Sequence, residues 1–200
     1  MNANLNEFAQ PTRYSWLTAF AGKYMNDWLT ISASALATII NEDVKEGGSA
    51  GNHRKLTPYI SASFKPFYHE EFRIRFFYKD IFRLPSFNDL YYQEVGNTKL
   101  RPENARQYNV GLTYSKNVCP FLPYLSATID AYYNKVTDKI IAYPTKNLAV
   151  WSMRNLGEVE IKGIDATGSL SLQPWERIRI NLSGNYTYQQ ALDITNSDPT

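Results

Sequence analysis

Apolar and polar side chains alternate along most of this chain, and this period of two limits its fold more than any other feature. Between Trp28 and Ile40, every second residue from Leu29 to Ile39 is leucine, isoleucine or alanine, and most of the residues between them are threonine or serine. Successive side chains of a strand point to opposite faces, whereas a helix would scatter these residues around its axis. The stretch is therefore predicted to be a β-strand with one apolar and one polar face.

The same alternation predicts about eight strands in all, of which the first is the least regular. Their length of roughly ten residues exceeds the five or six of most soluble strands and matches the about 9–11 that a tilted membrane-crossing strand needs. The predicted strands span residues 14–24, 28–40, 56–65, 72–79, 108–115, 125–134, 164–172 and 177–189.

The predicted connections alternate between short and long. Short turns fall at residues 26–27, 66–71, 117–123 and 173–176, and long loops fall at 41–55, 83–103 and 140–156. Outer-membrane barrels have short periplasmic turns and long extracellular loops. The pattern favours an antiparallel transmembrane β-barrel, and the alternative is a large soluble β-sandwich or open sheet with one buried face.

Composition excludes several other classes of protein. The 21 basic and 19 acidic residues are nearly balanced, so nothing indicates nucleic acid as a partner. One cysteine rules out a disulfide framework, and with only two histidines neither a metal site nor a cofactor is predicted. No segment reaches the ~20 apolar residues of a membrane helix, and the N-terminus lacks the features of a signal peptide.

The stretch FRLPSFNDLYYQEVGNTKLRPENARQYNVGLTY runs from Phe82 to Tyr114, from just after the fourth predicted strand into the fifth. This motif resembles the barrel domain of TonB-dependent outer-membrane receptors. In that family an aromatic–Arg–x–Pro–Ser segment precedes an acidic–Leu–Tyr element, Gly–Asn, Leu–x–Pro–Glu and a strand. The matching residues are Phe82, Arg83, Pro85, Ser86, Asp89, Leu90, Tyr91, Gly96, Asn97, Leu100, Pro102, Glu103, Tyr108, Gly111, Leu112 and Tyr114.

Two later stretches agree with the same family in order and spacing. They are ATIDAYYNKVTDKI at residues 127–140 and the hairpin NLGEVEIKGIDATGSLSLQPWERIRINLSGNYTYQQA at residues 155–191. The resemblance therefore covers residues 82–191, and residues 13–81 fit as barrel strands without a comparable motif.

The resemblance implies a location, partners and an activity. It implies a Gram-negative outer-membrane receptor that contacts membrane lipid, encloses a plug domain and imports a scarce nutrient with energy from TonB. The nutrient would be a ferric siderophore, cobalamin or a glycan. Such barrels have about 22 strands, so residues 1–200 are expected to form one partial barrel domain, without plug domain or signal peptide. A passive porin or adhesin barrel and a soluble all-β binding protein are the alternatives.

If the apolar face meets lipid, the polar face meets the lumen. Arg73, Arg75 and Lys79 then form an inward basic row, which Arg83 extends. Such a row could attract an anionic substrate through its summed field. It could equally balance acidic groups of the plug or of neighbouring strands, and both interpretations stay open.

Contact with substrate is expected at the long loops, because binding residues concentrate on loops held by a rigid scaffold. The candidates from the second and third loops are Arg83, Tyr91, Tyr92, Tyr143, Trp151, Met153 and Arg154. Packing between loops is the alternative role for the tyrosines.

Catalysis is not expected. Glu42, Asp43 and Glu46 fall in the first long loop, where no fixed partner is predicted, and Glu158 and Glu160 lie at a loop–strand junction. The chain also contains no nucleophile elbow, zinc-protease motif or phosphate loop.

Overall fold

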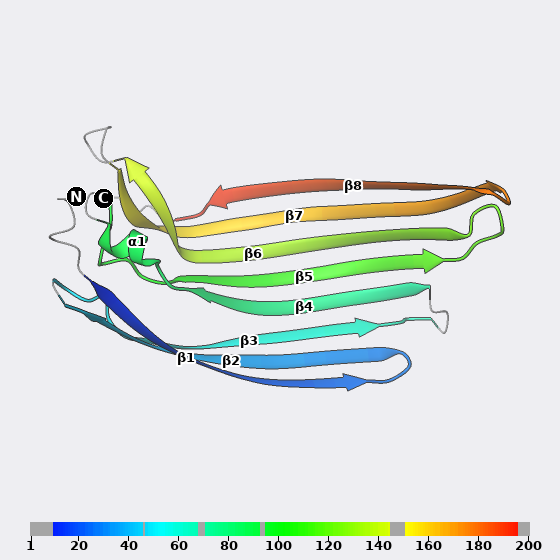
Figure 1. Ribbon diagram of the computed structural model, residues 1–200. Coiled ribbons are helices and arrows are strands. Elements are labelled where there is room, and N and C mark those ends of the chain that lie inside the picture. The colour runs from blue at the N-terminus through cyan, green and yellow to red at the C-terminus, as the bar shows by residue number, and fades with distance from the viewer. Residues whose placement is uncertain (1–9, 46, 68–70, 93–94, 145–150, 196–200) are drawn as a thin grey trace.

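The computed structural model describes residues 10–45, 47–67, 71–92, 95–144 and 151–195. In this part of the chain, eight strands form one antiparallel sheet in which each strand pairs with its neighbours in sequence (Figure 1). The all-β prediction is thereby confirmed. The elements are β1 (Pro11–Met25), β2 (Leu29–Val44), β3 (His53–Phe64), β4 (Phe72–Arg83), α1 (Phe87–Tyr91), β5 (Glu103–Lys116), β6 (Tyr124–Pro144), β7 (Trp151–Trp175) and β8 (Ile178–Asp193).

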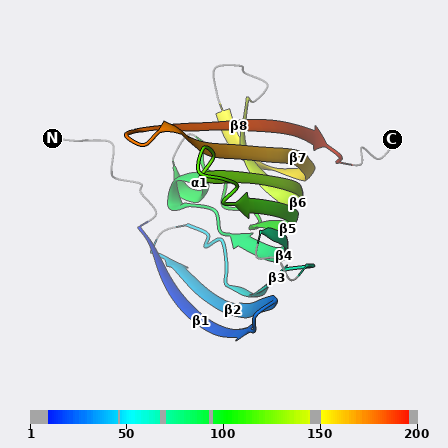
Figure 2. The same cartoon turned by 90° about the vertical axis from the view of Figure 1, so that its right-hand side faces the viewer.

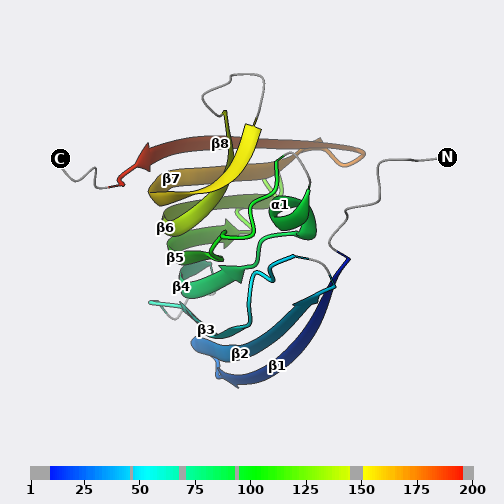
Figure 3. The same cartoon turned by 90° about the vertical axis from the view of Figure 1, so that its left-hand side faces the viewer.

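The sheet curves into an arc whose two edges are β1 and β8. Viewed along the strands from either end, the arc is open on one side, and α1 lies on its concave side (Figures 2 and 3). This is the shape of part of a barrel wall, with the concave face toward the lumen. Among the described residues there is no helix of the length and apolarity needed to cross a membrane.

Long and short connections lie at opposite ends of the sheet, as the sequence predicts. The turns after β1, β3, β5 and β7 lie at one end, and the connections after β2, β4 and β6 lie at the other (Figure 1).

The third long loop is shorter than predicted, because β6 and β7 continue as a paired hairpin beyond the other strands. The pairs Ile140–Asn155 and Tyr143–Ser152 extend the ladder, so only the tip lies between strands, at residues 145–150 outside the described part. The hairpin bends away from the sheet at its outer end (Figure 1). Asp138 interrupts the ladder there with φ of 56°, the left-handed region that Asp tolerates better than most residues.

The convex face carries the apolar side chains, and a row of tyrosines marks where they end. Tyr78, Tyr108 and Tyr133 are paired in register on β4, β5 and β6, with ring centroids 5.1 and 6.2 Å apart. The next outward positions on the same strands are Asp80, Arg106 and Lys135. An apolar band that ends in aromatic residues and is followed by charges is typical of a barrel surface crossing from hydrocarbon to headgroups.

The concave face is polar, and a glycine makes room on it for an ion pair between strands that are not neighbours. Arg75, Gly111 and Asp130 lie side by side on β4, β5 and β6, and Arg75 donates to both Asp130 oxygens at 3.0 and 2.8 Å. A Cβ at Gly111 would lie 2.2 Å from Asp130 Oδ1 and 2.8 Å from an Arg75 nitrogen. Gly111 therefore permits a link that spans three strands.

Gly111→Ala is expected to break this link and lower the stability of the wall by about 1–2 kcal/mol, the usual cost of overpacking. The control is Gly168→Ala on β7, since nothing lies within 4 Å of a Cβ added there. The measurement is the temperature at which the full-length receptor barrel unfolds in detergent. Two results would contradict the role of the ion pair. One is an equal loss of unfolding temperature in the two variants, and the other is a Gly111→Ala loss that is as large in an Asp130→Ala background as in wild type.

Candidate functional site

The connection from β4 to β5 is a folded element that begins with a capped helix. Pro85 precedes Ser86, whose hydroxyl accepts from the Asp89 N–H at 3.2 Å, while the Asp89 carboxylate accepts from the Ser86 N–H at 2.8 Å. This reciprocal capping box satisfies two donors that the first turn of a helix leaves free. The short helix α1, absent from the sequence prediction, therefore has a local cause in the sequence.

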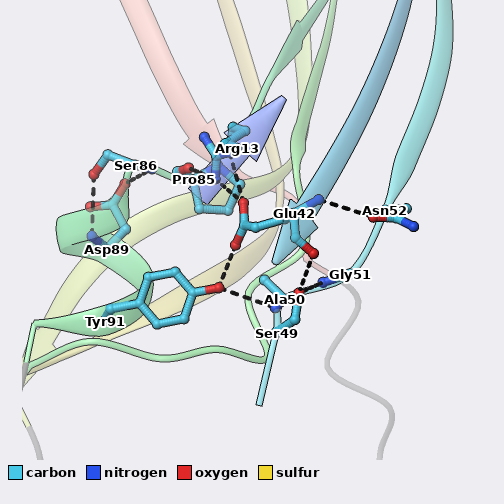
Figure 4. Close-up of polar contacts among 10 residues, drawn as sticks. All are labelled: Arg13, Glu42, Ser49, Ala50, Gly51, Asn52, Pro85, Ser86, Asp89 and Tyr91. Carbon is cyan, nitrogen blue, oxygen red and sulfur yellow. Dashed lines mark hydrogen bonds and ion pairs between the residues drawn. The ribbon is translucent and has the colours of Figure 1, made fainter. Parts of the chain in front are cut away.

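A buried carboxylate fastens this connection to the edge of the sheet (Figure 4). Glu42, whose side chain is 2% exposed, accepts from Arg13 Nε at 2.7 Å and also from the hydroxyl of Tyr91. Arg13 also donates to the carbonyl of Pro85 at 3.1 Å, and the Ala50 N–H donates to the Tyr91 hydroxyl at 3.2 Å. Four segments of the chain thus meet at one carboxylate.

The expectation that Glu42 and Asp43 lie in a flexible loop without a fixed partner is wrong, because both belong to β2. Glu42 is paired as above, and the Asp43 carboxylate accepts from the Val44 N–H at 2.9 Å. Glu46 lies outside the described residues. The ladder with β1, which pairs Glu42 with Arg13, carries the strand past the point where its alternation fades.

Tyr91 must stay protonated to donate to Glu42. Burial raises the pKa of Tyr91, and the hydrogen bond to Glu42 raises it further. A raised folded-state pKa means that this bond contributes fully below the ordinary tyrosine pKa and is lost only as pH rises through the raised value. The hydrogen bond from Tyr91 to Glu42 is therefore intact across the physiological pH range.

An apolar cluster lies beneath the β4–β5 connection. Leu90, Tyr91, Leu100 and Ile140 are buried together. The partly buried side chains packed against this cluster are those of Val44, Ala50, Phe87 and Met153. Most side chains of the sheet face either lipid or lumen, whereas these side chains are buried against one another. The hydrophobic effect of their burial holds the connection on the concave side.

The same connection is joined to the β6–β7 hairpin by paired hydrogen bonds. The Met153 N–H donates to the Val95 carbonyl at 2.9 Å, and Asn97 Nδ2 donates to the Met153 carbonyl at 3.0 Å. Asn155 accepts from the Arg101 N–H at 2.8 Å and returns a bond to the Arg101 carbonyl at 2.9 Å. The second and third predicted loops therefore form one surface at the mouth of the arc.

Most of the motif residues shape this surface. Gly96 lies against backbone atoms of Tyr92 and Leu90, where a Cβ would come within 2.6–2.8 Å. Glu103 accepts from Arg83 at 3.0 Å and from the Ile140 N–H at 2.6 Å. The motif between β4 and β5 thus encodes how the connection folds inward.

Comparison with known proteins agrees with this architecture. A family model described as TonB dependent receptor-like, beta-barrel, matches residues 12–200. The chain belongs to the TonB-dependent receptor family. The receptor is therefore an outer-membrane protein of a Gram-negative bacterium, in a family of transporters and not of enzymes. Membership of this family excludes the two alternatives, a passive porin or adhesin barrel and a soluble all-β binding protein.

Relatives and solved structures resemble the receptor over a fraction of their own length. A vitamin B12 transporter, BtuB, of Vibrio vulnificus (strain YJ016) is 34% identical over 84 residues, which are 42% of this chain and 13% of that protein. BtuB of Photobacterium profundum is 31% identical over 94 residues, 45% of this chain and 14% of that one.

Two solved structures share the fold. The copper transporter OprC aligns with a TM-score of 0.68 at 13% identity, over 90% of this chain and 30% of that one. The FrpB iron transporter from Neisseria meningitidis (F5-1 variant) aligns with a TM-score of 0.66 at 14% identity, over 96% of this chain and 28% of that one. The chain thus corresponds to less than a third of each, which confirms a partial barrel.

The predicted substrate residues divide into exposed and engaged groups. Tyr92, Tyr143 and Trp151 are 58, 50 and 49% exposed, and the Arg154 guanidinium lies 5.2 Å from the centre of the Tyr143 ring. Tyr91 is buried and Arg83 is paired with Glu103, so both hold the receptor's mouth together. Substrate contact stays a prediction for all of these residues.

The basic row divides in a similar way. Arg75 balances Asp130 on β6, two strands away in the sheet, and balancing acidic groups of the wall is one of the two roles expected for the row. Arg73 and Lys79 form no ion pair with any residue in the described ranges. The sequence prediction missed Arg13, Arg101, Asp138 and Asn155. Arg13 pairs with Glu42, Arg101 pairs with Asp138, and Asn155 bonds to the backbone of Arg101, and these partners lie too far apart in the chain for a spacing rule to show them.

Proposed function

We propose that the full-length receptor binds a scarce nutrient at its extracellular mouth and imports it with energy delivered by TonB. The wall described here would close with further strands into a barrel of about 22, around a plug domain. The transport activity, the plug and TonB come from family membership, because this chain spans only part of its relatives.

The observation that carries the proposal is the surface where the β4–β5 connection packs on the β6–β7 hairpin. Tyr92 and Trp151 are exposed on the two segments that meet there, Tyr143 and Arg154 form a cation–π pair on the other face of the hairpin, and a buried network fixes the backbone beneath them. Exposed aromatic and guanidinium groups on a rigid base suit a bulky ligand with flat apolar and anionic parts.

Cobalamin and ferric siderophores fit this chemistry best among the candidates. The relatives and similar structures are described as transporters of vitamin B12, copper and iron. A metal-bearing chelate would bring both a broad apolar surface and negative charge to these residues. A glycan, which stacks on aromatic rings but carries no required charge, is the second candidate.

Uptake of labelled cobalamin and ferric siderophores into cells carrying the full-length receptor tests the proposal. Saturable uptake of one ligand, lost when TonB is deleted, is expected. Tyr92→Ala with Arg154→Ala should raise the half-saturating concentration about tenfold, which corresponds to about 1.4 kcal/mol of lost contact. Phe121→Ala, an exposed aromatic in a turn at the opposite end, should change nothing. TonB-independent uptake, or no dependence on the variants, would sink the proposal.

A further inference from the structure

The β6–β7 hairpin projects beyond the strands on either side of it. The ladder with β5 ends at Thr137, and the ladder with β8 ends at Val159. Beyond these positions the ladder of the described chain joins residues 139–144 to residues 151–156 and to no third strand. A two-stranded ribbon on its own is marginally stable in water. The angle at which this ribbon leaves the sheet therefore needs support from other contacts.

The base of the hairpin is the place where the ribbon turns most easily. Its ladder is continuous from Tyr124 to Pro144 on β6 except at Asp138, whose partner would be Gly157. A position with few interstrand hydrogen bonds offers little resistance to local movement. Beyond this region the hairpin bends away from the sheet (Figure 1). The contacts around Asp138 and Gly157 thus set the angle of the hairpin.

Arg101, in the β4–β5 connection, holds one side of this base. Its guanidinium donates to Asp138 Oδ1 from Nε at 2.9 Å and from Nη2 at 2.5 Å. The Asn155 amide bonds to the N–H and the carbonyl of Arg101, and it also donates to the Asp138 carbonyl at 2.7 Å. Arg101 is therefore bonded to both strands of the hairpin next to the missing pair.

The end of β8 holds the other side of the base. The Glu158 N–H donates to the Thr195 hydroxyl at 3.0 Å, and the Ile194 N–H donates to the Glu158 carbonyl at 2.9 Å. The Thr195 hydroxyl in turn donates to Asp193 at 2.6 Å. A Cβ at Gly157 would lie 2.4 Å from Thr195 Cγ2, so the glycine permits this approach. The base of the hairpin is thus held from both flanks.

A small rotation at the base would produce a large displacement at the exposed aromatic residues. Trp151 lies on the same face of β7 as Met153, which packs on the apolar cluster beneath Tyr92. Trp151 is six positions from Gly157, about 20 Å at ~3.3 Å per residue, so a turn of about 15° would move it by about 5 Å. Such a displacement exceeds the ~4 Å reach of a side-chain contact.

We propose that Arg101 is a positioning residue for nutrient binding. Through Asp138 and Asn155 it holds the hairpin at the angle that presents Trp151 and Tyr92 to the same ligand. The inference rests on the proposed function, because it concerns how that surface is held for binding. Without the guanidinium the hairpin would populate other angles, and the apparent affinity would fall by the fraction of receptors that keep the native angle.

The position of the hairpin is measured by pulsed electron paramagnetic resonance on the full-length receptor. Nitroxide labels are attached through Ala142→Cys and Arg54→Cys, two exposed positions on the hairpin and at the mouth end of β3. Other cysteines are replaced, with Cys119→Ser among them. Wild type should give one narrow distribution of distances. Arg101→Ala should leave about a third of receptors at the wild-type distance, the size expected when a largely exposed ion pair is lost.

Uptake into cells carrying the same variants tests the consequence for binding. The probe is the labelled cobalamin or ferric siderophore whose uptake by wild type saturates. Arg101→Ala should raise its half-saturating concentration about threefold at an unchanged maximal rate per receptor, the reciprocal of the fraction at the wild-type distance. If no probe is taken up, the proposed function fails, while the distance measurement still decides whether Arg101 holds the hairpin.

Arg106→Ala is the matched control. The Arg106 side chain is 68% exposed and that of Arg101 is 69% exposed, but Arg106 Nε lies 4.0 Å from its partner Asp80. This variant should change neither measurement. Arg101→Lys should recover part of both. Asp138→Asn should match Arg101→Ala, because asparagine tolerates the left-handed backbone and lacks only the charge.

Three outcomes would overturn the proposal. The first is an unchanged distance distribution in Arg101→Ala, and the second is an equal broadening in Arg106→Ala. The third is a loss of affinity in Arg101→Ala that does not follow the fraction of receptors at the wild-type distance, since Arg101 would then act on the ligand directly.

Discussion

Arg13→Ala is expected to release the β4–β5 connection from the edge of the sheet. The substitution leaves the Glu42 carboxylate buried without its cation, and removing one partner of a buried pair costs about 3–5 kcal/mol. It also removes the donor to the Pro85 carbonyl and the guanidinium 4.7 Å from the Phe87 ring. Amide hydrogen exchange of residues 84–101 in the full-length receptor should accelerate about a hundredfold or more.

The comparison variant is Arg54→Ala. Arg54 is an exposed arginine near the mouth end of β3, and its loss should leave exchange of residues 84–101 unchanged. Arg13→Lys should give an intermediate acceleration, since it keeps the charge without the guanidinium geometry. Unaltered exchange in Arg13→Ala would show that the apolar cluster alone holds the connection.

Gly96→Ala is expected to prevent the connection from folding as described. The added Cβ would meet the Tyr92 N and O atoms and the Leu90 carbonyl within 2.8 Å, and all three belong to the backbone. No rotamer change can relieve such contacts, so the cost should reach about 3 kcal/mol, the upper end for overpacking. The bond from Gly96 N–H to the Tyr92 carbonyl, 2.7 Å, would be lost. Protease added to whole cells should then cleave this segment at least tenfold faster.

Gly48→Ala is the control for this substitution. Gly48 lies in the β2–β3 connection at the same end of the receptor, with nothing within 4 Å of an added Cβ. In Gly48→Ala, protease should cleave the β4–β5 connection at the same rate as in wild type. If Gly96→Ala were as resistant as Gly48→Ala, the close approach would have no energetic weight.

The strands could be predicted because their cause is local. From Trp28 to Ile40, alternation alone places isoleucine and alanine on one face and serine and threonine on the other, and the sheet keeps that sorting. The hairpin of β6 and β7 exceeded its prediction because alternation fades after residue 134 while the ladder between the two strands continues.

The site could be predicted only in part. The tyrosines of both loops were identified as candidates from their position, but Tyr91 proved buried while Tyr92, its neighbour, is exposed. Nothing local distinguishes the two, because the difference comes from Glu42, 49 positions earlier. Arg13 shows the same limitation, since its partners lie on β2 and beyond β4.

By itself the sequence determined a membrane-crossing antiparallel sheet, the end at which its long connections lie, and its family, since periodicity and motif depend on neighbours in sequence. Only the tertiary structure decided that the β4–β5 connection folds inward onto a buried carboxylate and joins the β6–β7 hairpin. It also decided that Gly111 makes room for an ion pair and that the ladder between β3 and β4 ends at Tyr59–Lys79. These features depend on register and on contacts between distant segments, which a one-dimensional pattern does not contain.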